Sequence, residues 1–188
     1  MKIQMESLLN GKTIEVNFDE QIVFSHLAQD ESAVWSLLVA GGYLKVEDVD
    51  AMNYCMNKIT LATFSYFDVG SEGAGNQEPE RFYHGFVLGL IADQTDIYEI
   101  RSNRESGFGR YDVMLIPRDR KRQGLPAVIM EFKVHNSRQE ADLEATVQAA
   151  LSQIEEKNYD AELLGRGFEK EQIRHYGFAF KGKEVLIG

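Results

Sequence analysis

Residues 103–134 read NRESGFGRYDVMLIPRDRKRQGLPAVIMEFKV, and this stretch carries the strongest structural signal in the chain. Two apolar runs within it, Tyr111 to Ile116 and Ala127 to Val134, have the composition of β-strands. The segment that joins them, Arg118 to Pro126, is polar, basic and rich in turn-forming residues. The pattern predicts a β-hairpin.

Both predicted strands contain charged residues in otherwise apolar runs. Because strand side chains alternate between two faces, Glu131 and Lys133 should share one face while Phe132 points to the other. Asp112 lies near the start of the neighbouring strand and can join them on that face. The sequence therefore predicts two carboxylates and an ammonium group close together on one side of the sheet.

A hard divalent cation is a chemical reason for such a set. Mg²⁺ takes oxygen ligands, commonly one or two carboxylates completed by water and substrate oxygens, so Asp112 and Glu131 would supply its protein ligands, with the Phe132 carbonyl as a further candidate. Lys133 would then orient a nucleophile or stabilise charge on a phosphodiester. The alternative is a salt bridge between Glu131 and Lys133, and spacing alone does not decide, because so short a pattern has many chance matches.

The wider sequence resembles the PD-(D/E)XK nuclease superfamily, and most closely its bacterial branch found as the C-terminal domain of AAA-ATPase-like proteins. The resemblance covers roughly residues 78 to 188 and rests on five segments: RFYHGFVLGL at 81–90, SNRESGFGRYD at 102–112, VIMEFK at 128–133, ALSQIEEKNY at 150–159 and YGFAF at 176–180. Tyr111 stands where the superfamily's name has a proline.

This resemblance implies an α/β fold with a mixed central β-sheet flanked by helices, a restriction-endonuclease-like core, preceded by an N-terminal helical segment. It implies a metal-dependent hydrolase that cleaves phosphodiester bonds in nucleic acid, DNA in the first place, with Mg²⁺ or alternatively Mn²⁺ as cofactor. The catalytic candidates are Asp112, Glu131, Lys133 and Gln153; the metal ligands are Asp112, Glu131 and Glu80; and the substrate-binding candidates are Arg110, Arg104, Lys157 and Tyr159.

Several of these assignments have a plain structural alternative. Glu80 at the start of a helix predicted over residues 81–92 is also explained by the helix dipole, and Gln153 with Lys157 is also an ordinary pair on a helix surface. Tyr159 either stacks on a base or caps the core. His84 is a weaker second candidate on the stripe that contains Glu80, and Glu105 ranks below Asp112 because it is expected in a turn.

The net charge of −10 argues against nucleic acid as a partner, since phosphate binding depends on Lys and Arg. The charges are, however, unevenly distributed along the chain. Residues 101–122 contain seven Lys or Arg against three Asp or Glu, a local surplus of four positive charges around the predicted site. The alternative is a solvated basic loop without a partner.

The remaining chain suggests an N-terminal, mainly helical segment at 1–68, a linker or mobile loop at 69–80 and the nuclease-like domain at 81–188. The segment WSLLVAGGYL at 35–44 resembles the helical tail before the nuclease-like domain in the ATPase-linked proteins, which makes an ATPase a possible partner. No GxxxxGK(S/T) loop is present, so ATP hydrolysis by this chain is not expected.

The chain lacks an apolar run of membrane-spanning length and a signal-peptide pattern, and its single Cys55 fits a reducing compartment. We therefore expect a cytoplasmic protein with no membrane association. The oligomeric state stays open. The competing functional class is a catalytically idle nuclease-fold module that binds nucleic acid or a partner protein, and retention of the acid pair with Lys133 favours the enzyme, because two acids repel phosphate unless a metal is present.

Overall fold

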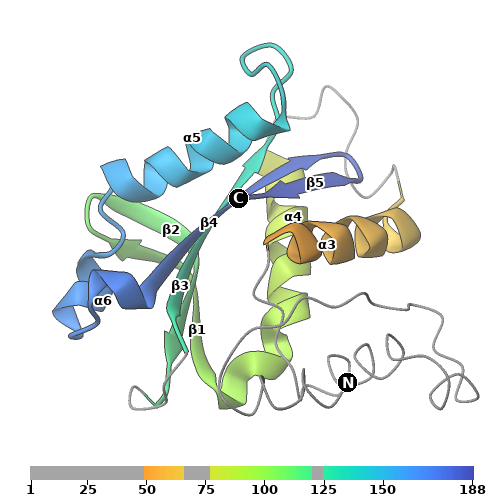
Figure 1. Ribbon diagram of the computed structural model, residues 1–188. Coiled ribbons are helices and arrows are strands. Elements are labelled where there is room, and N and C mark those ends of the chain that lie inside the picture. Colours follow the sequence, from red (N-terminus) through yellow and green to blue (C-terminus); the bar gives the residue numbers. More distant parts are fainter. Residues whose placement is uncertain (1–48, 66–76, 120–124) are drawn as a thin grey trace, which may run out of the picture. The chain divides into compact units, whose positions relative to one another are not determined.

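A computed structural model describes residues 49–65, 77–119 and 125–188, all within one compact unit that runs from Val49 to Gly188. The α-helices are α3 (Val49–Thr63), α4 (Gln77–Ile91), α5 (Leu143–Glu156) and α6 (Ala161–Gly165), with short 3-10 turns at Ala92–Asp96 and Lys170–Gln172. The strands are β1 (Tyr98–Ser106), β2 (Gly109–Pro117), β3 (Ala127–Val134), β4 (Ile173–Lys181) and β5 (Glu184–Ile187). Figure 1 shows their arrangement.

The five strands form one sheet in the order β1-β2-β3-β4-β5. β1–β2, β2–β3 and β4–β5 pair antiparallel, whereas β3 and β4 pair parallel along their whole length, from Ala127↔Ile173 to Val134↔Phe180. A parallel pair needs a long crossover, and α5 with α6 provides it. The predicted mixed α/β fold with flanking helices is confirmed.

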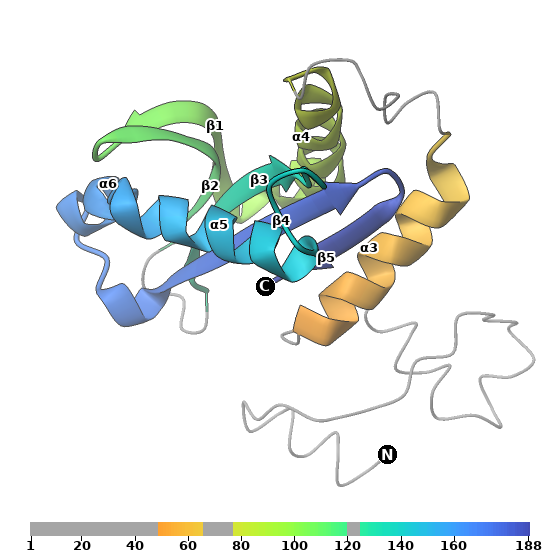
Figure 2. The same ribbon diagram turned by 90° about the horizontal axis from the view of Figure 1, so that it is seen from above.

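Helices cover both faces of the sheet (Figures 1 and 2). One face packs against α3 and α4 in a core rich in aromatic rings, including Tyr83, Phe132, Phe178 and Phe180. The other face packs against α5 and α6 through Met114, Ile129, Ile154 and Leu163. Each face needs its own cover because strands that are apolar on both sides must be buried on both sides.

Helix α3 also closes the outer edge of the sheet. Asn53 donates to the Ile187 carbonyl at 2.8 Å and accepts from the Ile187 N–H at 2.6 Å, and Asn57 makes the same pair of bonds to Val185 at 2.6 and 3.0 Å. These side chains satisfy backbone groups of β5 that would otherwise be open to another strand. Residues 49–63, expected within the N-terminal segment, thus pack directly on the sheet.

Other predictions for the N-terminal half fall partly outside the described residues. The helices expected over Asp19 to Tyr43 lie there, as does most of the 69–80 linker, so the domain boundary stays a prediction. The helix expected at 81–92 begins earlier, at Gln77. Within the described parts of the chain, no helix combines the length and apolar character needed to cross a bilayer.

Candidate active site

Strand β3 separates apolar from charged side chains by simple alternation. Phe132 faces α4, with its ring 5.2 Å from that of Phe178 and edge-on to it. Glu131 and Lys133 face the opposite side, where both contact Gln153 of α5. The face sharing predicted from the period of two is therefore present.

Asp112 joins this face at the point where β2 leaves β3. Backbone pairing of the two strands runs from Leu115↔Val128 to Val113↔Met130, and the same register continued by one residue would put Asp112 opposite Glu131. The Asp112 Oδ2 atom instead accepts a hydrogen bond from the Phe132 N–H at 2.8 Å. Burial raises the pKa of Asp112, against the lowering effects of that hydrogen bond and of the nearby cations Lys133 and Arg110.

Gln153 connects the acidic and basic members of the site. Its Oε1 accepts from Lys133 Nζ at 2.8 Å, while its Nε2 donates to Glu131 Oε1 and, at 3.2 Å, to the Tyr159 hydroxyl. The amide can satisfy both neighbours only in this orientation, because an ammonium donates and a carboxylate accepts. We call Asp112, Glu131, Lys133 and Gln153 the Glu131 cluster.

Tyr159 supports the cluster from behind. Its hydroxyl donates to the Arg110 carbonyl at 2.9 Å, and its side chain is only 1% exposed. A base needs an exposed ring face on which to stack, so the structure favours the core-capping alternative for this residue. Burial raises the pKa of Tyr159, which keeps the hydroxyl protonated as a donor.

Glu131 is the least compensated group of the cluster. The residue is 4% exposed, and its Oε2 is buried without a hydrogen-bond partner among the described residues. A backbone hydrogen bond from Asp112 lowers the pKa of Glu131. Burial, followed by the Asp112 carboxylate, raises the pKa of Glu131 to about 8, and Lys133 offsets only part of that.

Glu80 at the start of α4 lies close enough to interact with this cluster. Burial raises the pKa of Glu80, and the Asp112 carboxylate raises it further, against Lys133, His84 and Arg110. The three carboxylates are nevertheless not gathered as a ready-made centre: across residues 49–65, 77–119 and 125–188, no three Asp, Glu, His or Cys side chains converge closely enough to hold a metal ion. The assignment of Glu80 as a ligand stays a prediction.

His84, the weaker of the two candidates on α4, makes hydrogen-bond contacts to β1. Its Nε2 is 2.9 Å from Ser102 Oγ and its Nδ1 is 3.1 Å from Asn103 Nδ2, and its ring meets Phe132 edge-on. Burial lowers the pKa of His84, although Glu80 opposes this. The residue links α4 to β1 through these hydrogen bonds.

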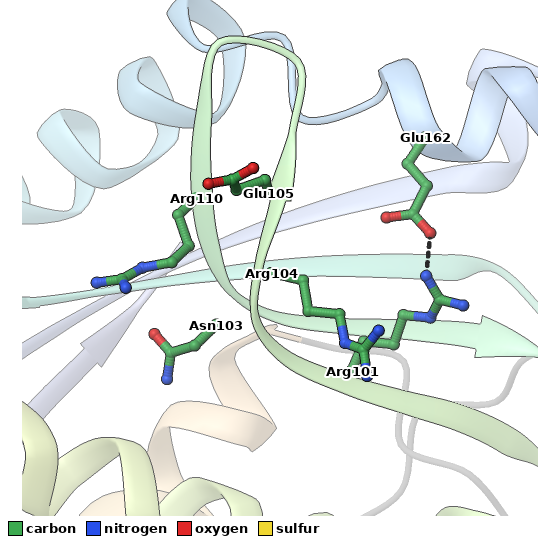
Figure 3. A pocket seen from close by; sticks show the side chains of 6 residues that line it. All are labelled: Arg101, Asn103, Arg104, Glu105, Arg110 and Glu162. Atoms are coloured by element: carbon green, nitrogen blue, oxygen red, sulfur yellow. Dashed lines mark hydrogen bonds and ion pairs between the residues drawn. The ribbon is translucent and has the colours of Figure 1, made fainter.

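An open pocket of about 660 Å³ lies along the β1–β2 hairpin (Figure 3). It is lined by Arg101, Asn103, Arg104, Glu105, Arg110 and Glu162. Arg104 and Arg110 are exposed, and neither has an ion-pair or hydrogen-bonded side-chain partner among the described residues. The positive charge of Arg110 also lowers the pKa of Asp112. Arg110 therefore lines the pocket and also interacts with the Glu131 cluster.

Part of the predicted basic surface is used internally. Arg101 pairs with Glu99 at 2.7 Å and with Glu162, and Arg166 pairs with the same two carboxylates at 3.2 and 3.0 Å. We call Glu99, Arg101, Glu162 and Arg166 the Glu162 cluster. Arg118 donates to the Thr95 carbonyl at 2.7 Å, and residues 120–124 lie outside the described parts of the chain.

The Glu162 cluster was missed by sequence reasoning. Arg101 and Glu162 are 61 residues apart, on a strand and a helix whose contact no local spacing announces. In the sequence Arg101 is only one more positive charge near the predicted site. In the structure its guanidinium is paired with the carboxylates of Glu99 and Glu162. The positive surface available to a ligand is correspondingly smaller.

A comparison with models of protein families agrees with the fold. The sequence model described as the PD-(D/E)XK nuclease superfamily matches residues 78–188, which is more than half of the chain and includes every member of both clusters. Neither the curated proteins nor the solved structures contain a match. The match extends from the start of α4 through β5, so the chain belongs to the PD-(D/E)XK nuclease superfamily.

Proposed function

We propose that this protein hydrolyses phosphodiester bonds of nucleic acid in a reaction that depends on a divalent cation, Mg²⁺ or Mn²⁺. The observation that carries the proposal is the proximity of Asp112 and Glu131 beside Lys133, with one Glu131 oxygen buried and without a partner among the described residues. A buried carboxyl oxygen without a partner costs free energy unless something else satisfies it. A cation is the partner that two adjacent carboxylates favour.

The donor set fits a hard cation. Phe132 N–H engages one Asp112 oxygen and Gln153 engages one Glu131 oxygen, which leaves the second oxygen of each carboxylate for a ligand. Two protein carboxylates completed by water and substrate oxygens suit Mg²⁺. When bound there, the cation would supply Lewis-acid polarisation of the phosphodiester.

The side chains around the cation have separate tasks in this proposal. Lys133, held by the Gln153 carbonyl oxygen, orients the attacking water or stabilises negative charge that grows on the phosphate in the transition state. Arg110 binds a substrate phosphate through its forked donors. Gln153 positions Lys133 and Glu131 relative to each other, and Tyr159 holds Gln153.

The substrate in this proposal is nucleic acid, DNA before RNA, with Arg104 and Lys157 as further phosphate contacts. Arg104 lines the pocket and Lys157 is exposed at the end of α5, next to Gly109. An ATPase partner is a further part of the proposal that rests on the resemblance of residues 35–44 alone.

Titration calorimetry of Mg²⁺ and Mn²⁺ into the full chain tests the metal site, with and without a phosphodiester oligonucleotide. Asp112→Asn and Glu131→Gln should lose the binding heat and any cleavage of DNA while the circular dichroism spectrum stays unchanged. Glu156→Gln, an exposed carboxylate on α5, is the matched control and should bind as the parent does. Undiminished metal binding by both variants would refute the site, and binding of oligonucleotide without cleavage would support the idle-module alternative.

A further inference from the structure

The tip of the β1–β2 hairpin presents an aromatic ring to solvent. Phe108 is 81% exposed, the highest value among the large apolar residues of the described chain. A single exposed apolar side chain is ordinary and carries no argument by itself. Here the backbone that holds the ring and the charges around it add to the observation.

The hairpin tip is fixed to the end of α5. Gly107 has a φ of +59°, and a Cβ there would lie 2.2 Å from the carbonyl oxygens of both Lys157 and Asn158. The Phe108 N–H donates to the Lys157 carbonyl at 2.7 Å, and Ser106 Oγ donates to the Tyr159 carbonyl at 2.7 Å. Only glycine permits this close approach in a left-handed conformation.

This attachment ties the ring to the proposed active site. The segment that receives the hairpin, residues 157–159, directly follows the helical turn that carries Gln153, and Tyr159 bonds both to Gln153 and to the Arg110 carbonyl. The Phe108 backbone and the Glu131 cluster are therefore both held by the short segment 157–159. A ligand bound at Phe108 would therefore have a fixed position relative to the Glu131 cluster.

Three exposed cations and one exposed carboxylate, Glu105, lie on the hairpin and at the end of α5. Arg104 and Arg110 lie on the two strands of the hairpin and line its pocket, where Figure 3 shows Arg110 at one end and the Arg101–Glu162 pair at the other. The side chain of Lys157 lies against Gly109, next to Phe108 in the chain. Exposed cations beside an exposed aromatic ring match a ligand that alternates phosphates with flat, apolar-faced rings.

We propose that Phe108 is a stacking platform for a nucleobase of single-stranded nucleic acid whose backbone phosphates contact Arg104 and Arg110. In an intact duplex each base face is covered by its neighbours, so a platform of this kind selects unpaired bases. The inference rests on the proposed function for its substrate class and adds to it a preference for single strands or unpaired ends.

The test measures binding separately from cleavage. Fluorescein-labelled oligothymidylate of about 12 nucleotides, a length within the usual range of single-strand sites, and an abasic strand of equal length are titrated with the full chain in Ca²⁺, by anisotropy. A gel verifies that both strands stay intact. The variants are Phe108→Ala, Phe108→Trp and, as matched control, Tyr54→Ala, which removes an exposed aromatic ring from α3.

Phe108→Ala should weaken binding of oligothymidylate about 5- to 100-fold, the range for loss of one base–aromatic stack, and leave binding of the abasic strand unchanged. Phe108→Trp and Tyr54→Ala should bind both strands as the parent does. Equal losses on both strands, no loss on either, or failure of the parent to bind or to prefer the strand with bases would each overturn the platform.

The two proposals fail separately. Metal-dependent cleavage by the parent with unchanged binding by Phe108→Ala removes only the stacking platform. Base-dependent binding that Phe108→Ala abolishes, in a protein that takes up no divalent cation and cleaves nothing, removes only the proposed hydrolysis.

Discussion

The two polar clusters of this protein are built from similar residues and differ in charge balance. In the Glu162 cluster two carboxylates face two guanidinium groups, and the Arg101 hydrogen bond is the main cause that lowers the pKa of Glu99. In the Glu131 cluster two carboxylates face one ammonium. Burial raises the pKa of both carboxylates, and repulsion from Asp112 raises that of Glu131 further. The charges of the first cluster balance within it, whereas the second contains two carboxylates and a single cation.

Under the proposed function, that difference distinguishes a structural cluster from a functional one. Paired charges that satisfy one another stabilise the contact between β1 and α6, where Tyr111 adds a hydrogen bond to Glu162 at 3.4 Å. Two buried carboxylates with too few cations beside them destabilise the ligand-free protein. Such a pair is typical of a site that binds a cation. Substitutions in the first cluster should therefore affect folding, and substitutions in the second should affect activity.

The largest effect is expected for Lys133→Met. The change roughly keeps the length of the side chain and removes the charge that faces the phosphate in the proposed mechanism. The cleavage rate should therefore fall by about 100-fold or more, as when one electrostatic contact to a transition state is lost. Single-turnover kinetics with saturating Mn²⁺ and DNA measures it. Metal affinity within a few-fold of the parent is the companion result, and an unchanged cleavage rate would remove Lys133 from the mechanism.

Glu162→Gln tests the balanced cluster. The variant leaves Arg101 and Arg166, whose side chains are 20% and 30% exposed, with one carboxylate between them, and we expect a loss of about 1–3 kcal/mol in the free energy of unfolding. Urea denaturation measures that loss. Metal binding should not change, and a variant as stable as the parent would show that the cluster contributes nothing to folding.

The unbalanced cluster should reveal itself in the pH dependence of stability. Because the folded pKa of Glu131, about 8, exceeds its ordinary value of 4.5, the folded state holds a proton that the unfolded state releases between those two values. The metal-free protein should therefore lose stability as pH rises from 5 to 8, by up to about 1.4 kcal/mol per pH unit from this group.

Denaturation of the parent and of Glu131→Gln at several pH values, in a chelator, isolates that contribution. The parent should show the steeper decline, and saturating Mn²⁺ should flatten it, because a bound cation takes the place of the proton. Parallel curves for the two proteins would mean that Glu131 titrates normally.

The smallest effect is expected for Tyr159→Phe. The substitution removes the hydroxyl that bonds Gln153 and the Arg110 carbonyl and keeps the buried ring, so the unfolding free energy should fall by about 0.5–1.5 kcal/mol. A concurrent decrease in cleavage rate with unchanged metal affinity, measured on the same samples, would identify Tyr159 as a residue that positions Gln153. A change in metal affinity would speak against that role.

Much of this architecture could be predicted from local patterns. The apolar runs at 111–116 and 127–134 form antiparallel neighbours, and the glycines at 107 and 109 flank the hairpin turn. In α5 the apolar residues Val147, Ala150 and Ile154 recur at helical spacing in the sequence, and all three are buried. Such signals survive folding because they reflect the periods of strand and helix, which depend on nearest neighbours in the chain.

Local patterns were less informative about partners. Arg101 and Arg110 look alike in the sequence, yet one is tied to Glu162 and the other is exposed at the pocket. The sequence allowed Tyr159 either to stack on a base or to pack in the core, and its burial favours the core. Exposure and pairing are set by residues tens of positions away, whose proximity results from packing of α5 and α6 on the sheet.

The sequence by itself determined that Glu131 and Lys133 share a face opposite Phe132, because alternation along a strand follows from backbone geometry. Only the tertiary structure decided what that face contains. The splaying of β2 from β3 brings the Asp112 carboxylate to the Phe132 N–H, and the docking of α5 inserts Gln153 between Lys133 and Glu131. The unpartnered oxygen of Glu131 and its raised pKa arise from that enclosure, since a pKa depends on the solvent and charges around a group and not on its place in the chain.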